Sequence, residues 1–165
     1  MSQPVLTAEE VLRWNESISA AWRRLLGEHP ELLAMPCDIA RTSTVAELLQ
    51  HIVAVELRYA ERVGGVPETD YAQIPFDTVE KIYATHDRAA ELLRQTLAAD
   101  LDWDKEIEFT TRSAGKGRAS LKTMLFHALL HSVRHYAQLA TLVRRHNNDI
   151  ALPPGDYLFM GVARA

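Results

Sequence analysis

The stretch that decides the fold is residues 125–145, LFHALLHSVRHYAQLATLVRR. Leucine, alanine and valine recur in it every three or four positions, which is the spacing of one face of an α-helix. His127, His131 and His135 stand four residues apart within it. Since four residues turn a helix by about 400°, successive histidines differ by about 40° and rise by about 6 Å. The three imidazoles therefore form one slanting row on a long helix.

Three other segments show the same apolar spacing, and two of them open with the capping-box pattern Thr-x-x-Glu, at Thr7–Glu10 and Thr44–Glu47. In that pattern the threonine hydroxyl and the glutamate carboxylate each accept from a free backbone N–H at the start of the helix. We predict four helices, from Thr7 to about Leu26, from Thr44 to Gly64, from Asp77 to about Leu97 and from Ser120 to about His146.

Residues 101–119, LDWDKEIEFTTRSAGKGRA, interrupt the helical spacing. Ile107 and Phe109 alternate with charged residues, as in a half-buried strand, and Ala114–Gly117 is typical of a turn. We therefore expect a short hairpin or extended excursion between the third and fourth helices. Four amphipathic helices without an internal repeat predict an all-α fold, a four-helix bundle that forms a single domain over residues 1–165.

Composition excludes several classes of protein. Hydrophobic residues make up 47% of the 165 residues and charged residues 24%, which is ordinary for a globular protein and argues against disorder. With 18 Lys+Arg against 22 Asp+Glu, the net charge of −4 disfavours a nucleic-acid partner. The single cysteine, Cys37, excludes a cysteine-rich metal site. No signal peptide and no apolar run of about 20 residues are evident, so we expect a cytoplasmic protein without a membrane segment.

The histidine row predicts a metal site. Imidazoles at positions i and i+4 of a helix can bind one metal ion. All three cannot, because the outer pair lies about 12 Å apart along the axis while Zn–N bonds are about 2.0–2.1 Å. The spacing leaves two pairs open, His127 with His131 or His131 with His135. A further ligand must come from another helix, and both His51 and His86 lie on the apolar faces of theirs.

Two segments carry a resemblance to a known family. They are LLQHIVAVELRYAERV, residues 48–63, and HSVRHYAQL, residues 131–139. With the order of the helices, they make the chain resemble the DinB/YfiT-like family of small bacterial metal-binding four-helix bundles. Family members often carry a histidine four residues before a second one, followed by Arg-Gly-Gln. Here Tyr136 and Ala137 replace the Arg-Gly, and Gln138 is in place.

The resemblance implies a ligand set. Carried over by position, it makes His51, His131 and His135 the ligands of a divalent transition metal, with zinc and nickel foremost. His127 then lies near the metal without binding it, and His86 belongs to the core or supports the site. The resemblance also implies a homodimer. Three imidazoles suit zinc, nickel, copper or iron, so the sequence leaves the metal open.

Three histidines leave a coordination position open, as in catalytic sites. The resemblance favours a transferase that acts on a small-molecule substrate with a low-molecular-weight bacterial thiol. The alternatives are a metal-dependent hydrolase and a non-catalytic metal-binding stress-response protein. No general base is evident, since Glu56 lies about 140° around the helix from His51. Gln138, one turn beyond His135, is expected to orient that ring, and Arg134 is expected on the solvated face.

Overall fold

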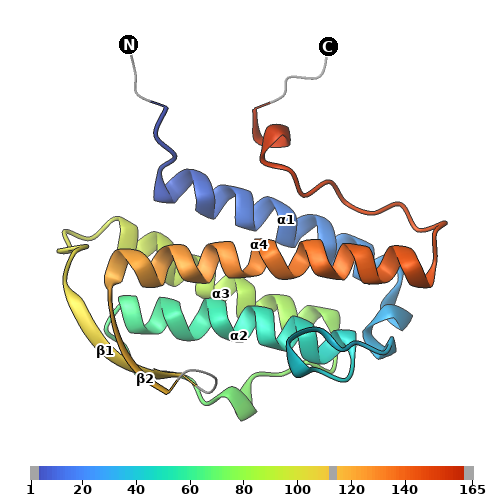
Figure 1. Cartoon of the computed structure of the whole chain (residues 1–165), viewed down its shortest axis with the longest axis horizontal. Helices are drawn as coiled ribbons and strands as arrows, with labels where there is room; N and C mark the ends of the chain where they lie inside the picture. The colour runs from blue at the N-terminus through green and yellow to red at the C-terminus, as the bar shows by residue number, and fades with distance from the viewer. Residues whose placement is uncertain (1–3, 112–114, 162–165) are drawn as a thin grey trace.

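The computed structural model describes residues 4–111 and 115–161. Four long α-helices and one antiparallel hairpin follow each other along the chain, as Figure 1 shows. The long elements are α1 (Ala8–Glu28), α2 (Val45–Val63), α3 (Val79–Leu97), β1 (Glu106–Thr111), β2 (Gly115–Ser120) and α4 (Leu121–His146). Short 3₁₀ helices lie in the connections: η1 (Pro30–Ala34), η2 (Ile39–Arg41), η3 (Tyr71–Gln73) and η4 (Tyr157–Met160). The predicted four helices and the hairpin between α3 and α4 are confirmed.

The first capping box forms as predicted, and the second forms only in part. The Thr7 hydroxyl accepts from the Glu10 N–H at 3.2 Å, and the Glu10 carboxylate accepts from the Thr7 N–H at 2.7 Å. The Thr44 hydroxyl likewise accepts from the Glu47 N–H at 3.2 Å. The Glu47 carboxylate, however, accepts from the Ser43 N–H at 2.6 Å instead of closing the box on Thr44.

The third helix begins one residue later than predicted. Thr78 has the extended backbone of an N-cap, with φ −138° and ψ 155°, and its hydroxyl accepts from the Lys81 N–H. The side chain of Asp77 instead forms an ion pair with the Lys81 ammonium at 2.6 Å. Both residue types make good caps, so the prediction of Asp77 failed because Asp77 has a charged partner one turn further on.

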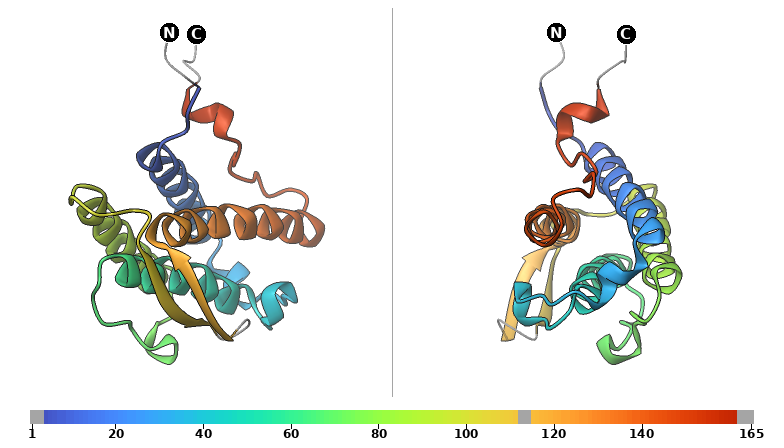
Figure 2. Two further views of the ribbon diagram at one scale, coloured as in Figure 1. Left: turned by 60° about the vertical axis from the view of Figure 1, so that its left-hand side comes forward. Right: turned by 90° about the vertical axis from the view of Figure 1, so that its right-hand side faces the viewer.

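The four helices pack around a shared apolar core. Helix α2 lies against α3 and α4, and α1 also lies against α3 and α4, as the two views of Figure 2 show. Leu49, Ile52, Tyr83 and Leu129 are fully buried between them. Within the described residues, no helix combines the length and the apolar character that crossing a membrane requires.

The hairpin covers the end of the bundle where α2 ends and α4 begins. Its strands pair from Glu106 opposite Ser120 to Thr111 opposite Gly115. Ile107 and Phe109 pack against the cluster of Val63, Leu121 and Met124. Gly115 begins β2 with φ +71°, a left-handed conformation that glycine adopts without strain. The predicted turn is wrong for residues 115–117, which pair with Thr111, Thr110 and Phe109 as part of β2. Ala114, the first residue of the predicted turn, lies outside the described residues.

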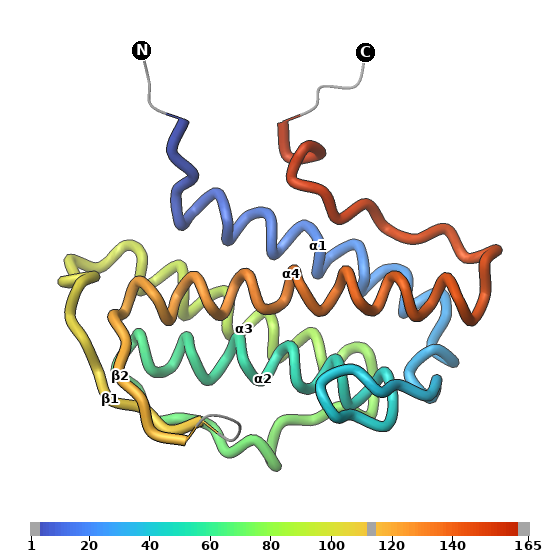
Figure 3. Tube along the Cα trace, in the orientation of Figure 1, coloured from blue at the N-terminus to red at the C-terminus, as the bar shows by residue number. Residues whose placement is uncertain are grey.

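The segment after α4 runs back beside α1, as the trace in Figure 3 shows. The Trp14 indole N–H donates to the Gly155 carbonyl at 3.0 Å, and the Tyr157 ring lies edge-on to the indole at 5.3 Å. Trp22 is buried and stacks on Tyr136 at 5.8 Å. Both tryptophans therefore pack within the chain.

One buried carboxylate connects all four helices. Glu56 of α2 is only 1% exposed. Its Oε1 accepts from Asn15 Nδ2 of α1 at 3.0 Å and from Ser132 Oγ of α4 at 2.6 Å. Its Oε2 lies 2.7 Å from Nδ1 of His86 on α3. Of the two roles open to His86, the structure therefore shows a core position, tied to Glu56.

Glu56 and His86 hold each other in their charged forms. Burial disfavours the carboxylate, but the charge of His86 and the hydrogen bonds from His86, Ser132 and Asn15 outweigh it and lower the pKa of Glu56. Burial also disfavours the imidazolium, but the charge and hydrogen bond of Glu56 outweigh it and raise the pKa of His86. The pair therefore contributes most between the ordinary pKa values of 4.5 and 6.5.

Replacing His86 by Gln keeps a hydrogen-bond donor beside Glu56 and removes the positive charge. We expect the free energy of unfolding between pH 4.5 and 6.5 to fall by about 3–5 kcal/mol, because a buried carboxylate loses its counter-charge. The loss should shrink as pH rises through the raised pKa of His86 and as pH falls through the lowered pKa of Glu56. Urea denaturation followed by circular dichroism over a pH series measures it.

The matched control is His146→Gln, since His146 is exposed at the end of α4. This variant should stay within about 0.5 kcal/mol of the wild type. A loss in His86→Gln that is the same at every pH would contradict the ion pair.

Candidate metal centre

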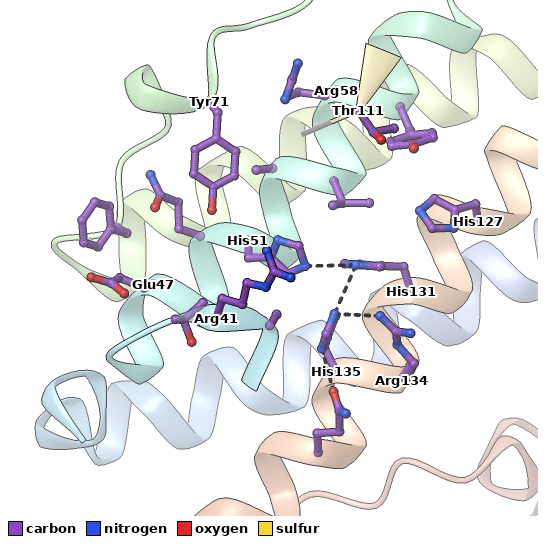
Figure 4. Close-up of a pocket in the computed structure, with 18 of the residues that line it drawn as sticks. Arg41, Glu47, His51, Arg58, Tyr71, Thr111, His127, His131, Arg134 and His135 are labelled. Atoms are coloured by element: carbon purple, nitrogen blue, oxygen red, sulfur yellow. Dashed lines mark hydrogen bonds between the residues drawn. The ribbon is translucent and has the colours of Figure 1, made fainter. Parts of the chain in front are cut away.

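Three histidines from two helices converge at one point. His51 comes from α2, and His131 and His135 come from α4. Their potential ligand nitrogens all lie within 4.8 Å of one another, and Nε2 of His131 is 3.1 Å from Nε2 of both other rings (Figure 4). Ligand nitrogens at about 2.0–2.1 Å from a tetrahedral zinc ion lie about 3.3 Å apart. Two of the three nitrogen–nitrogen distances thus match one metal-ion site, and the third nitrogen pair lies within 4.8 Å.

The contacts of α2 with α4 bring the cluster together. His131 is 9% and His135 2% exposed, and His51 lies at the edge of the same seam. Ser132, which directly follows His131, donates to Glu56. This hydrogen bond lies one residue from the cluster, and it fixes the position of α4 along α2. Of the two helix pairs that the spacing leaves open, the structure joins His131 and His135 to His51.

Gln138 orients His135 as predicted. Nδ1 of His135 lies 2.7 Å from Oε1 of Gln138. Because a carbonyl oxygen only accepts hydrogen bonds, Nδ1 must carry the ring proton, and Nε2 presents its lone pair to the cluster. Fixing the tautomer of a ligand histidine in this way is a common feature of metal sites.

His131 remains neutral at physiological pH. Burial, followed by the neighbouring rings of His135 and His51, lowers the pKa of His131 to about 2. Its Nδ1 is buried without a hydrogen-bond partner among the described residues. Burial also lowers the pKa of His135. The cluster therefore offers imidazole nitrogens, a donor set that suits a divalent transition metal. On this observation the three residues fit such an ion.

His127 lies beside the cluster and outside it. Its ring centre is 5.4 Å from that of His131 and 4.8 Å from that of Tyr59. Burial and the charge of Arg134 lower the pKa of His127. The ring is thus a neutral group in the wall of the same pocket.

A pocket of about 820 Å³ opens over the cluster. Four arginines line it, namely Arg41, Arg58, Arg62 and Arg134. Arg134 is exposed, as expected from the sequence, and it also lines this pocket, with Nη2 at 3.2 Å from Nε2 of His135. Arg58 and Arg62 follow His51 by seven and eleven residues, the spacing of one helix face, so periodicity could have found them.

Fold and site together define a helical bundle in which a three-histidine cluster could hold a metal ion. The model of the DinB family matches residues 1–146, and the chain belongs to this family. A comparison with curated proteins gave no match.

Replacing single histidines tests the ligand set. We expect about one divalent metal ion per chain in protein purified without added metal, measured by plasma mass spectrometry. His131→Ala should lose the most metal, because Nε2 of His131 faces both other rings. His135→Ala should lose less, and His127→Ala should retain nearly all of it. A His127 variant that loses more metal than the His135 variant would show that the other helix pair binds.

Replacing Gln138 tests the orientation of His135. Gln138→Leu removes the acceptor for the Nδ1 proton, so zinc affinity should fall about 10–100-fold. Gln138→Glu keeps an acceptor and should bind zinc at least as tightly as the wild type. Competition with a fluorescent chelator measures both. Equal affinity in the Leu variant and the wild type would assign no role to this contact.

Proposed function

We propose that the protein is a divalent-metal-dependent transferase that uses a low-molecular-weight thiol and a small electrophilic substrate. The observation that carries the proposal is a three-histidine cluster in the lining of a pocket of about 820 Å³. Because its ligands are uncharged, a divalent ion bound there would keep its full charge and lower the pKa of an incoming thiol.

The residues around the cluster favour a thiol over water. Of the acidic residues in the described part of the chain, Glu47 alone lines the pocket, and its carboxylate accepts from the Ser43 N–H. Glu56 is buried in the core and bound to three other helices. Among the described residues, Glu47 is thus the one carboxylate that lines the pocket, and one of its two oxygens is already engaged by a backbone N–H. A thiol, with an ordinary pKa near 8.5, needs far less help to ionise.

The chemistry of the proposed step is simple. The thiolate sulfur bonds to the electrophilic carbon, and the leaving group departs with the electron pair of the broken bond. The proton of the thiol passes to solvent through the open pocket. The residues of the chain bind and orient the reactants, which can account for most of the rate enhancement in such a reaction.

A hydrolase is the second candidate, because His127 offers a neutral imidazole in the pocket wall. Its ring lies 5.4 Å from His131 and 4.8 Å from Tyr59. This position would suit a group that accepts a proton from water. His127→Gln should abolish hydrolysis if His127 acts in this way, and it should change thiol transfer little.

The test is an assay of zinc-loaded protein with chlorodinitrobenzene and a panel of thiols: cysteine, glutathione and the thiols of a bacterial extract. We expect turnover that requires both thiol and metal and falls at least 100-fold in His131→Ala. Two readouts monitor the reaction: the release of chloride from the substrate and the growth of the absorbance of the thioether product.

The control variant is Cys37→Ser. Cys37 is buried and does not line the pocket, so transfer should persist without it. Turnover of ester substrates that needs metal and ignores thiol would favour the hydrolase. Tight metal binding without turnover of any pair would favour a non-catalytic metal-binding protein.

A further inference from the structure

The wall of the pocket carries more positive than negative charge. Among the residues that the structure describes, Arg41, Arg58, Arg62 and Arg134 line it together with a single acidic residue, Glu47. They come from three parts of the chain: the connection between α1 and α2, helix α2 and helix α4. Figure 4 shows the side chain of Arg41 extending over the pocket towards the histidines and that of Arg134 beside His135.

Arg58 and Arg62 are held in the wall by Glu68. Arg62 makes two hydrogen bonds to its carboxylate, at 2.6 and 2.9 Å, and Arg58 makes one at 3.0 Å. Partial burial alone would raise the pKa of Glu68, but the hydrogen bonds and charges of Arg62 and Arg58 outweigh it, so the pKa is lowered. Arg62 also lies over the rings of Tyr59 and Phe109, at 4.8 and 5.6 Å. These contacts fix both side chains and leave one carboxylate to balance two charges.

Arg41 and Arg134 have no such counter-charge. Among the described residues, 4–111 and 115–161, no carboxylate lies within ion-pair distance of either guanidinium group. Arg134 donates a hydrogen bond from Nη2 to Nε2 of His135, a neutral acceptor that is also a ligand atom of the candidate metal site. A bound metal ion would use that lone pair. Arg134 would then have donors facing the pocket beside a second positive charge.

The backbone at Arg41 is strained. Ala40 and Arg41 have φ values of +55° and +61°, two successive non-glycine residues in the left-handed region. Such conformations cost free energy and are concentrated at functional sites. Hydrogen bonds on both sides hold the segment, from Thr42 to the Ile39 carbonyl and from the Cys37 N–H to the Ser43 carbonyl. This backbone conformation thus occurs at a residue whose guanidinium group lies over the pocket (Figure 4).

We propose that Arg41 and Arg134 bind an oxyanion, a carboxylate or a phosphate group, of the molecule that enters the pocket. Guanidinium groups match the geometry of both anions and form strong charge-assisted hydrogen bonds to them. Nη2 of Arg134 lies 3.2 Å from Nε2 of His135, which places the anion site next to the candidate metal site. The inference rests on the proposed function for its claim that this anion belongs to a substrate or cosubstrate.

The test is titration calorimetry with inorganic phosphate and with malonate, at constant ionic strength, on zinc-loaded and on metal-stripped protein. We expect at least one of the anions to bind both forms, and to bind the zinc-loaded form more tightly. Arg41→Met and Arg134→Met should each weaken binding about tenfold, the value of one hydrogen bond to a charged group. Arg41→Lys and Arg134→Lys should recover part of the affinity, since they keep the charge.

The matched control is Arg144→Met, on the same helix as Arg134, exposed and outside the pocket lining. Its anion affinity should stay within twofold of the wild type. Anion binding that is absent, or equal in the wild type and both Met variants, would overturn the proposal even if zinc binds. Arginine-dependent anion binding in a protein that binds no zinc would uphold it while the proposed function fails.

Discussion

The buried carboxylate of Glu56 is the constraint on which the structure depends. A charge that is 1% exposed is stable only when its oxygens are paired, and its partners come from each of the other three helices. Apolar faces alone tolerate sliding of one helix along another, whereas this hydrogen-bonded ion pair accepts one alignment. Since Ser132 follows His131, the same contact places His131 opposite His51.

The environments of His86 and His131 shift the pKa of the ring in opposite directions. His86 faces a carboxylate, and its pKa is raised although the ring is buried. His131 faces other imidazoles and the charge of Arg134, and its pKa falls to about 2, with burial as the largest cause. In the core Glu56 thus favours the charged form of His86, and in the pocket burial favours the neutral form of His131. One residue type serves both purposes because its neighbours differ.

The sequence predicts the helices and the histidine row well, because both depend on local periodicity. It could not choose between His51 and His86, since both lie on apolar faces and the choice depends on the alignment of α2 with α3 and α4. The resemblance to the DinB family supplied that choice. The position of Arg41 was not predictable, because it follows from two positive φ angles in a connection without periodic pattern. Asp77 failed as a cap because Lys81 competes for its carboxylate.

The charge of the whole chain and the charge of the pocket have different consequences. The chain carries a net charge of −4, which disfavours large polyanions at long range. Inside the pocket, four arginines and an uncharged histidine cluster produce the opposite field over a short distance. Charges separated by more than about 8–10 Å are screened at physiological salt, so only a ligand small enough to enter experiences this field. If the proposed anion site exists, it would favour small anions over large polyanions by the position of a few side chains, while the net charge of the chain remains negative.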